Sequence, residues 1–421
     1  MDSQLDSRTA ADSAAQVHGA YDPHFRRLVR TFARLFPGRA RSGGALSVYL
    51  DGQPLVDVWT GWECRTTTTP WSADTGAMVF SATKGMASTV IHRLHDRGLI
   101  DYEAPVAEYW PAFAANGKAA LTVRDIMDHR AGLSQLNGVT AEQVLDHIAM
   151  EERLAAAAPG LSAGKSAYHA LTYGWILSGL ARSVTGKGMR ELFRSELAQP
   201  LNTDGIHLGR PPVGSPTHAA QIVTLASTRQ NRIFDTVARR VAAHPRSALF
   251  GALYYEGVRA AMQKDMRFLD AEIPSANAVA TARGIARIYG AIANGGTIEG
   301  NRFLAADTVK ELTAERSFPI DRSVYVPLGF HLGYHSVPRQ FLPGFGHVGL
   351  GGSFGWADPA SGVAVSFAHS RLATSLPIDQ VAFTVLYLLA HRAAARARKD
   401  GFTPIADFGA PFTKTPAAST A

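Results

Sequence analysis

Residues 77–85 read Ala-Met-Val-Phe-Ser-Ala-Thr-Lys-Gly, at the point where an apolar stretch turns into an amphipathic helix. Ser81 and Lys84 are three positions apart, so a helix that begins near the serine places both side chains on one face. A serine hydroxyl needs a neighbouring base to act as a nucleophile, and a lysine serves only if its pKa falls below its usual value of about 10.4. The spacing therefore predicts covalent catalysis by Ser81 with Lys84 beside it.

The same Ser-x-x-Lys pattern occurs a second time, so the pattern alone does not select the serine. Ser162 and Lys165 match it, residues 160–164 also match Gly-x-Ser-x-Gly, and Ser353 lies in a similar glycine-rich stretch. A hydrolase nucleophile of the Gly-x-Ser-x-Gly type follows a buried strand and opens a helix. Ser162 instead follows a helix-forming run, and Ser353 lies in a predicted hairpin. Only Ser81 heads a convincing helix.

The composition is that of a globular protein with a large core. The chain has 421 residues, of which 46% are hydrophobic and 18% charged, enough for one large domain or two lobes that share a cleft. Its apolar runs are shorter than the roughly 20 residues of a membrane helix, and residues 1–23 lack the pattern of a secretory signal. The single cysteine, Cys64, excludes an internal disulfide. We expect a cytoplasmic protein without a membrane span.

Charge and histidine content do not indicate a nucleic acid or a metal. The chain has 42 basic and 35 acidic residues, and part of the excess lies at 391–399 in a predicted helix, where such a run usually forms a solvated face. The pairs His92/His95 and His331/His335 have metal-ligand spacing, but chance produces such pairs among 15 histidines. We expect a small-molecule partner, no nucleic acid, no cofactor and no metal.

Strands are predicted near both ends of the chain. Asp51-Gly52 is a typical hairpin turn between two of them. The predicted strands are residues 44–50, 55–59, 345–349, 353–357 and 363–369. Helices are predicted at 22–36 and 377–398. This arrangement predicts an α+β fold, with one antiparallel sheet covered by terminal helices.

The long middle of the chain is mainly helical in pattern. Met86, Val90 and Ile91 lie on one helical stripe, and helices do not alternate with strands, so a doubly wound sheet is disfavoured. We expect a large helical lobe inserted into the sheet lobe. The expected units are a flexible tail at 1–20, a sheet lobe from 21–73 and 324–400, the inserted lobe at 74–323, and a C-terminal tail at 401–421.

Two further motifs complete a candidate site. Tyr168-His169-Ala170 lies at the opening of a helix, and a tyrosine beside Ser81 and Lys84 could exchange protons during acyl transfer. His347-Val348-Gly349 lies on a glycine-rich strand whose backbone N–H groups could hold an oxyanion. Each motif also has a plainer interpretation, as a core tyrosine and as a bulged strand.

Together, Ser81-x-x-Lys84, Tyr168 and His347-x-Gly349 resemble the serine β-lactamase and penicillin-binding-protein superfamily. More narrowly, the chain resembles the class C-like family VIII carboxylesterases, and residues 121–133 are also similar to that family. The resemblance covers about residues 44–389. It implies a β-lactamase/transpeptidase-like fold, with the site in the cleft between the two lobes.

The resemblance also implies roles for the site residues. Ser81 would attack an acyl carbonyl, Lys84 and Tyr168 would share the proton transfers, and the N–H groups of Ser81 and Leu350 would hold the oxyanion. Water would then hydrolyse the acyl-enzyme. The substrate-binding residues would be His347, Gly349 and His169. Because Lys84 and Tyr168 would titrate as a coupled pair, which of them is the base stays open.

Two departures from the β-lactamase pattern favour esters as substrates. β-Lactamases have Asn where this chain has Ala170, and Lys-Thr-Gly where it has His347-Val348-Gly349, so a fixed cation is replaced by a titratable group. We expect a carboxylesterase that acts on small acyl esters. The alternatives are acyl transfer, D-amino-acid peptidase or amidase activity, weak β-lactamase activity, or a silent ligand-binding module.

Some properties stay open at this point. The natural substrate and its acyl-chain length are not indicated, and the chain could be a monomer or a homo-oligomer. We expect the segment 229–267, which is rich in Arg, Phe and Tyr, to shape the acyl or alcohol pocket.

Overall fold

A nine-stranded sheet forms the centre of the computed structural model, which describes residues 16–37, 42–64, 66–135, 138–224, 267–372 and 376–414. The strand order is β1-β3-β2-β16-β15-β14-β13-β12, with β4 paired to β3, and all neighbours are antiparallel. The strands are β1 (His18–Tyr21), β2 (Gly43–Leu50), β3 (Gln53–Cys64), β4 (Thr69–Pro70), β12 (Gly329–His331), β13 (Tyr334–Ser336), β14 (Phe345–Val348), β15 (Phe354–Asp358) and β16 (Val363–His369). The antiparallel sheet built from both chain ends is confirmed.

Local sequence explains the hairpin of β2 and β3. Asp51 and Gly52 both adopt positive φ angles, 50° and 73°, as a tight turn between twisted strands requires. Strand β2 is buried along its whole length. Its Leu46 and Val48 belong to one hydrophobic cluster and Tyr49 to another, because successive side chains point to opposite faces of the sheet.

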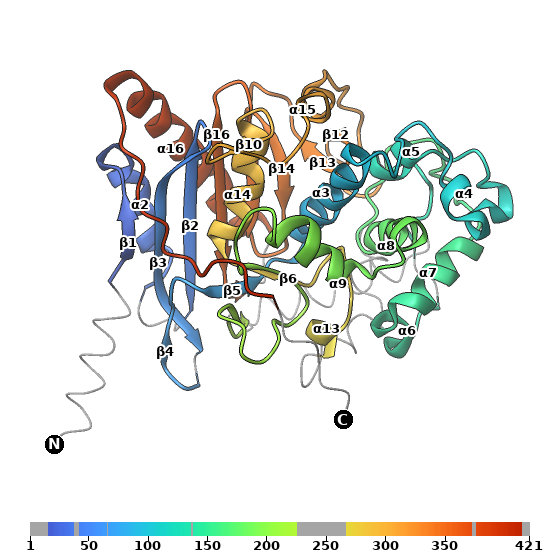
Figure 1. Cartoon of the computed structure of the whole chain (residues 1–421), viewed down its shortest axis with the longest axis horizontal. Coiled ribbons are helices and arrows are strands. Elements are labelled where there is room, and N and C mark those ends of the chain that lie inside the picture. The colour runs from blue at the N-terminus through green and yellow to red at the C-terminus, as the bar shows by residue number, and fades with distance from the viewer. Residues whose placement is uncertain are drawn as a thin grey trace.

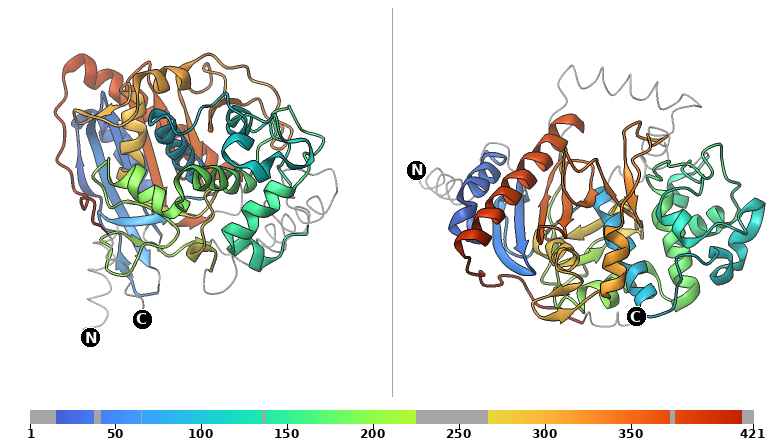
Figure 2. Two further views of the ribbon diagram at one scale, coloured as in Figure 1. Left: turned by 45° about the vertical axis from the view of Figure 1, so that its right-hand side comes forward. Right: turned by 90° about the horizontal axis from the view of Figure 1, so that it is seen from above.

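Helices cover both faces of this sheet. On one face lie η1 (Pro23–Phe25), α2 (Arg26–Arg34) and α16 (Leu376–Asp400), and on the other lies α14 (Ala282–Ala293), as Figure 2 shows from above. Helix α14 belongs to the stretch expected to form the inserted lobe, yet its Ala282 carbonyl accepts a hydrogen bond from the Ser366 hydroxyl of β16. The insertion therefore contributes one helix to the sheet lobe.

Among the remaining helices, α4 to α8 gather to one side of the sheet, with α3 between them and the sheet, and α9 lies near β6 (Figure 1). They are α3 (Thr83–Asp96), α4 (Val106–Tyr109), η4 (Pro111–Gly117), α5 (Val123–Met127), α6 (Ala141–Leu145), α7 (His147–Ala156), α8 (Thr172–Thr185), α9 (Met189–Leu192) and η5 (Phe193–Ala198). Short elements complete the described chain: β5 (Thr75–Met78), η3 (Phe80–Ala82), β6 (Ile206–Leu208), β7 (His218–Ala219), β8 (Val223–Thr224), α13 (Arg267–Asp270), β9 (Ala278–Ala280), β10 (Thr297–Ile298), β11 (Asn301–Arg302), α15 (Ala306–Thr313) and β17 (Arg371–Leu372). No described helix is both long and apolar enough to cross a membrane.

The N-terminal tail ends earlier than the sequence analysis expects. Strand β1 begins at His18 and pairs with β3, with His18 opposite Trp59. The rings of these two residues stack with their centres 6.5 Å apart. The expected tail at 1–20 is therefore wrong for its last three residues, because backbone pairing and this ring contact hold them on the sheet edge.

Residues 401–414, here called the C-terminal strap, have no helix or strand but are held by polar contacts. The Ile405 N–H donates to the Pro54 carbonyl at 2.9 Å, and Arg287 of α14 contacts Asp407 at 2.7 Å. Further along, the Arg194 guanidinium of η5 lies over the Phe412 ring, 4.8 Å from its centre. The strap therefore fastens the sheet lobe to the region around η5.

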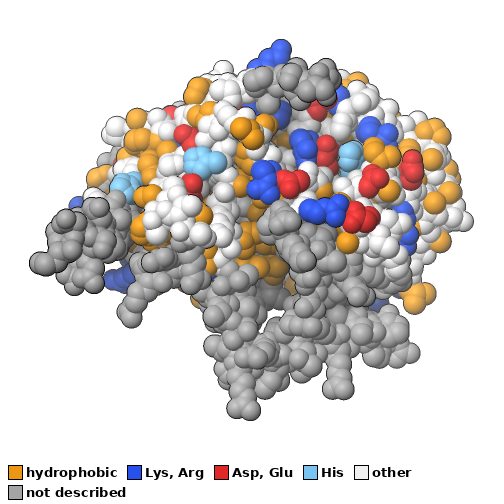
Figure 3. Space-filling view, turned by 90° about the horizontal axis from the view of Figure 1, so that it is seen from below, with side chains coloured by type: hydrophobic (Ala, Val, Ile, Leu, Met, Phe, Trp, Pro, Cys, Tyr) orange, Lys and Arg blue, Asp and Glu red, His pale blue; other side chains and the backbone are white. Residues whose placement is uncertain are grey.

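On one face of the molecule, the charged side chains of the described residues are mixed in sign. Seen from below, basic and acidic side chains of the described residues lie next to one another (Figure 3). Such mixing is typical of a solvated face.

Candidate active site

Ser81 lies on a sharp turn between β5 and α3. Phe80, the residue before it, has a φ of 47°, a left-handed conformation that a bulky side chain rarely adopts. Ala278 holds the turn from both ends, because its carbonyl accepts from the Val79 N–H at 3.0 Å and its N–H donates to Thr83 Oγ1 at 3.1 Å. The predicted helix that begins beside Ser81 is confirmed, and the serine side chain stays partly exposed.

Lys84 is fully buried beside the serine. Its Nζ lies 3.2 Å from Ser81 Oγ and 3.0 Å from the Ser275 carbonyl oxygen. Among the described residues no carboxylate forms an ion pair with it, and burial lowers its pKa well below the ordinary lysine value. An uncharged amine in this position can accept the serine proton.

Tyr168 completes the group that surrounds the serine hydroxyl. Its hydroxyl hydrogen bonds to the Ser81 side chain, and Lys84 Nζ lies 5.0 Å from the centre of its ring. Burial raises the pKa of the Tyr168 phenol and the negative charge of Asp321 raises it further, whereas the bond to Ser81 lowers it. The net effect keeps Tyr168 a protonated phenol.

His347 faces the same group from strand β14. Its ring centre lies 6.0 Å from that of Tyr168, and its side chain is 1% exposed. Burial lowers the pKa of His347 well below its ordinary value, and the nearby His335, Lys84 and His129 add to that effect. The imidazole is therefore uncharged, and within the described chain its Nε2 has no hydrogen-bond partner.

Gly349 brings the end of β14 against the serine turn. A Cβ on this residue would come within 2.2 Å of the Val79 carbonyl oxygen, so only glycine fits. The Gly349 N–H donates to the Ser353 carbonyl at 2.7 Å, which turns the chain at Leu350. Gly349 therefore packs against the turn that carries Ser81, and Leu350 follows it directly in the chain.

His169, the residue after Tyr168, contacts backbone groups. It is buried, its Nδ1 lies 2.6 Å from the Ala167 carbonyl oxygen, and its Nε2 accepts from the Leu133 N–H at 3.0 Å. Burial lowers its pKa to about 4. Both ring nitrogens bind backbone groups, so His169 ties two loops together, and its binding of substrate stays a prediction.

The rival serines lack the surroundings of a nucleophile. Ser162 lies in the loop between α7 and α8 and not at a strand-to-helix turn. Ser353 is buried at the start of β15, where its Oγ accepts from the His369 N–H at 3.4 Å. The described residues include no cluster of three or more His, Cys, Asp or Glu side chains that could hold a metal.

Two functional contacts come from residues that the sequence analysis does not single out. Ser275 supplies only a backbone carbonyl to Lys84, which no side-chain motif reveals. Asp321 is fully buried and accepts from the Tyr168 N–H across 153 residues of sequence. A local signal for Asp321 exists in Asp321-Arg322-Ser323, which is typical of an Asx turn, but it does not reveal the remote partner.

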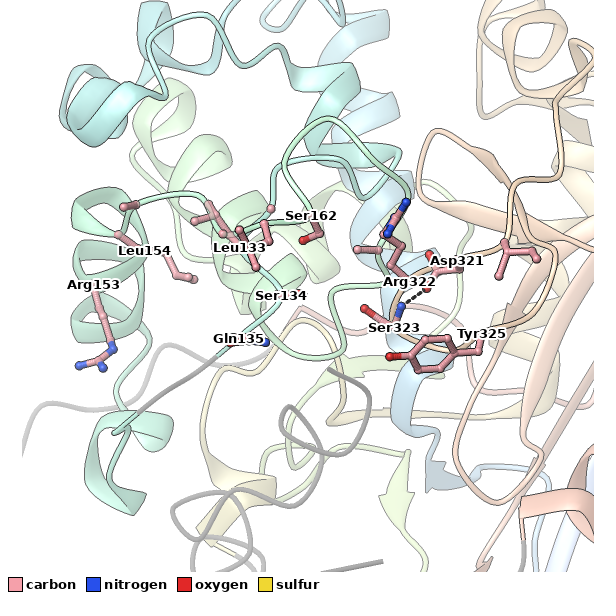
Figure 4. A pocket seen from close by; sticks show the side chains of 17 residues that line it. Leu133, Ser134, Gln135, Arg153, Leu154, Ser162, Asp321, Arg322, Ser323 and Tyr325 are labelled. Atoms are coloured by element: carbon pink, nitrogen blue, oxygen red, sulfur yellow. Dashed lines mark hydrogen bonds between the residues drawn. The ribbon is translucent and has the colours of Figure 1, made fainter. Parts of the chain in front are cut away.

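A cavity of about 850 Å³ lies next to the segment that leads into Tyr168 (Figure 4). Its wall includes Ala167, directly before Tyr168, and Asp321. The large apolar side chains of Leu161, Ile320 and Tyr325 at the cavity are 103%, 67% and 63% exposed. The other lining residues are Gly132, Leu133, Ser134, Gln135, Arg153, Leu154, Ala157, Ala158, Gly160, Ser162, Arg322 and Ser323. The expected pocket segment at 229–266 lies outside the described residues.

Known proteins resemble the chain over most of its length. The beta-lactamase family matches residues 25–386. The protein named esterase/beta-lactamase LipL of Mycobacterium tuberculosis is 58% identical over 99% of this chain and 97% of its own length. The crystal structure of a family VIII carboxylesterase has a TM-score of 0.77 and 32% identity, and covers 90% of this chain and 100% of the other. A penicillin-binding-protein homologue from Caulobacter crescentus has the same TM-score, 28% identity and the same coverage.

Proposed function

Because this chain belongs to the beta-lactamase family and has its predicted fold, we propose that it is a serine hydrolase that cleaves small carboxylic esters through an acyl-enzyme on Ser81. The observation that carries the proposal is the contact group of Ser81, Lys84 and Tyr168. An uncharged buried amine and a protonated phenol both reach one serine hydroxyl. This group has the base, the nucleophile and the acid that acyl transfer needs.

In acylation, Lys84 takes the proton of Ser81 as Oγ attacks the ester carbonyl carbon. The carbonyl electrons move to oxygen, where the N–H groups of Ser81 and Leu350 stabilise the negative charge. The bond from carbon to the alcohol oxygen then breaks, and Tyr168 gives its proton to that oxygen. The Lys84 ammonium returns a proton to Tyr168, so the serine proton has in effect passed to the alcohol.

Deacylation repeats these steps with water as the nucleophile. Lys84 takes a proton from the water as its oxygen attacks the acyl carbon, and the bond to Ser81 Oγ breaks. Ser81 regains its proton, the carboxylic acid leaves, and Lys84 and Tyr168 return to their starting states. No cofactor is needed to balance either half.

The surroundings of the serine favour esters over β-lactams. The neutral His347 occupies the position where β-lactamases have a lysine, so it attracts the carboxylate of a β-lactam weakly. Ala170 lacks the amide that would bind a lactam side chain. Weak β-lactamase activity is the second candidate function, since the name of the relative from Mycobacterium tuberculosis includes both activities.

We place the alcohol part of the ester in the cavity whose wall includes Ala167, the residue before Tyr168. Tyr168 protonates the alcohol oxygen, so this group must leave on the Tyr168 side of Ser81. The acyl oxygen must instead face the turn after β14, which contains Leu350. The cavity wall contains Ala167 and apolar residues such as Leu133 and Leu154, which suit an uncharged, apolar alcohol.

Active-site labelling tests the proposal directly. A fluorophosphonate probe should form an adduct on Ser81 in folded wild-type protein, and Ser81→Ala should abolish it while Ser162→Ala should leave it intact. The wild type should hydrolyse p-nitrophenyl butyrate far faster than nitrocefin. Labelling of Ser162 instead of Ser81, or no ester turnover by folded protein, would contradict the proposal.

A further inference from the structure

Asp321 is a buried carboxylate for which the described structure shows no ion pair. Its side chain is 0% exposed, and its two oxygens are satisfied entirely by N–H and O–H donors. One oxygen accepts from the N–H groups of Ser323 and Val324 at 2.8 and 3.0 Å, and the other accepts from Ser166 Oγ at 2.8 Å. The bond from Ser323 is drawn in Figure 4. Burying a charged group costs free energy of folding unless the group is fully hydrogen-bonded. The presence of a carboxylate at position 321 therefore needs an explanation.

The explanation lies in the remaining donor, the backbone N–H of Tyr168. This group donates to both Asp321 oxygens, at 3.1 and 3.0 Å. A second hydrogen bond joins the same two segments, because the Arg322 N–H donates to the Ser166 carbonyl at 2.9 Å. Asp321 therefore joins the segment before β12 to the segment that carries Tyr168, next to the tyrosine itself.

We infer that Asp321 is a positioning residue for Tyr168, which fixes the backbone of Tyr168 so that its hydroxyl stays at Ser81 and stays protonated. Charge and geometry act in the same direction. The Asp321 carboxylate disfavours a second negative charge nearby, so it opposes phenolate formation. Lys84 then acts as the base and Tyr168 as the acid, which decides the assignment that sequence leaves open. This inference rests on the proposed function.

The other groups around Tyr168 do not supply this effect. Ser81 hydrogen bonds to its hydroxyl, and the uncharged Lys84 lies over its ring. The imidazoles of His129 and His347, with ring centres 5.1 and 6.0 Å from that of Tyr168, are kept neutral by burial. Ser81, Lys84, His129 and His347 are thus uncharged, and of the described groups named here that surround Tyr168, Asp321 is the one that carries a charge.

The leaving group of the ester provides a readout that a merely structural role would not change. An acid is needed to expel an alkoxide but not to expel p-nitrophenolate, which leaves without a proton. Asp321→Asn should lower kcat/KM for ethyl acetate by about 100-fold and for p-nitrophenyl acetate by less than about 5-fold. In a Tyr168→Phe background, Asp321→Asn should cause no further loss for either ester.

A matched variant controls for the loss of a buried carboxylate. Asp358 is 4% exposed and also accepts from a serine hydroxyl and a backbone N–H, but it lies at the end of β15 and has His391 Nε2 at 3.1 Å. Asp358→Asn should change the two esters equally. If Asp321→Asn does not fold, Asp321→Ser serves instead, because its hydroxyl can still cap Ser323 and Val324 but is too short for Tyr168.

The outcomes separate this inference from the proposed function. If folded Asp321→Asn or Asp321→Ser loses activity equally toward both esters, or loses more in the Tyr168→Phe background, Asp321 does not act through Tyr168. Wild-type protein that hydrolyses both esters would leave the proposed function standing in that case. Wild-type protein that hydrolyses neither would overturn both.

Discussion

Two regions of the molecule meet at the Ser81 hydroxyl. One is the turn and helix that carry Ser81 and Lys84, and the other is the segment around Tyr168. Ser81 and Lys84 are three positions apart on one continuous turn and helix, so local geometry sets their 3.2 Å contact. Tyr168 instead depends on Asp321, 153 residues away, for the position of its backbone. The proposed nucleophile and base therefore form a local unit, whereas the proposed acid is placed by tertiary contacts. Substitutions in the local unit and at the remote acid should therefore have different effects on activity.

The largest effect is expected within the local unit. Ser81→Ala and Lys84→Met should each lower kcat/KM for p-nitrophenyl butyrate by about 10⁴-fold or more, because neither half-reaction proceeds without nucleophile or base. Since these residues act as one unit, the double variant should lose no more than either single one. Steady-state kinetics measures this, with Ser162→Ala as the unaffected control. Additive losses would contradict a single local unit.

A smaller and selective effect is expected for the remote acid. Tyr168→Phe should lower kcat/KM for ethyl acetate by about 10²- to 10³-fold, but for p-nitrophenyl acetate by about 10-fold. The reason is that only the alkoxide needs a proton to leave. If both esters lost activity equally, Tyr168 would act in proton removal from Ser81, and the division between base and acid would fail.

The next effect concerns residue 347 on β14, where the chain has an uncharged imidazole facing both units. His347→Lys would place a cation near Lys84, which lowers the pKa of Lys84 beyond the lowering that burial causes. Activity requires uncharged Lys84 and is lost as the pH falls through that pKa, so the acid limb of kcat/KM should move to lower pH. A pH–rate profile measures it. An acid limb that moves to higher pH would show that Lys84 is not the titrating base.

The same variant should also change the substrate preference. A cation at position 347 attracts the carboxylate of a β-lactam, so the ratio of nitrocefin to p-nitrophenyl butyrate hydrolysis should rise by about 10-fold. His347→Gln, which stays uncharged, is the control and should leave the ratio within about 2-fold. A similar rise in both variants would mean that the size of the side chain, not its charge, decides.

The smallest effect is expected in the cavity, on the preference for the alcohol part of the ester. Ala158→Trp narrows the cavity and should lower kcat/KM for 1-naphthyl acetate by about 10-fold, with methyl acetate nearly unchanged. Ala156→Trp is the matched control, because Ala156 is exposed and does not line the cavity. If Ala158→Trp instead changed the dependence on acyl-chain length, the cavity would hold the acyl group.

Much of the fold follows from local patterns in the sequence. The hairpin around Asp51, the strands near residue 345 onward and helix α16 rest on alternation, turn residues and helical stripes, which act within a few residues. The packing of α14 on the sheet was not predictable, because a helical stripe does not indicate which surface it covers. The strand from His18 to Tyr21 was missed because its partner, β3, supplies most of its stability.

The site divides in the same way. Ser81 and Lys84 could be predicted from spacing, and Tyr168 and His347 from a family resemblance. Asp321 could not, since its function depends on a contact between distant segments. His169 was assigned to the substrate because it follows Tyr168 in sequence, although its ring turns toward the backbone of Ala167 and Leu133.

The C-terminal strap affects the order in which tertiary contacts can form while the chain is being synthesised. Asp407 contacts Arg287 at 2.7 Å, and the Ala410 carbonyl accepts from the Asp204 N–H at 3.0 Å. Both partners leave the ribosome well before residues 401–414 do. The two lobes can assemble before the strap has been synthesised, so this clasp between them closes after they have met. A protease that cuts near Gly401 would therefore leave every catalytic residue in place and yet open the clasp.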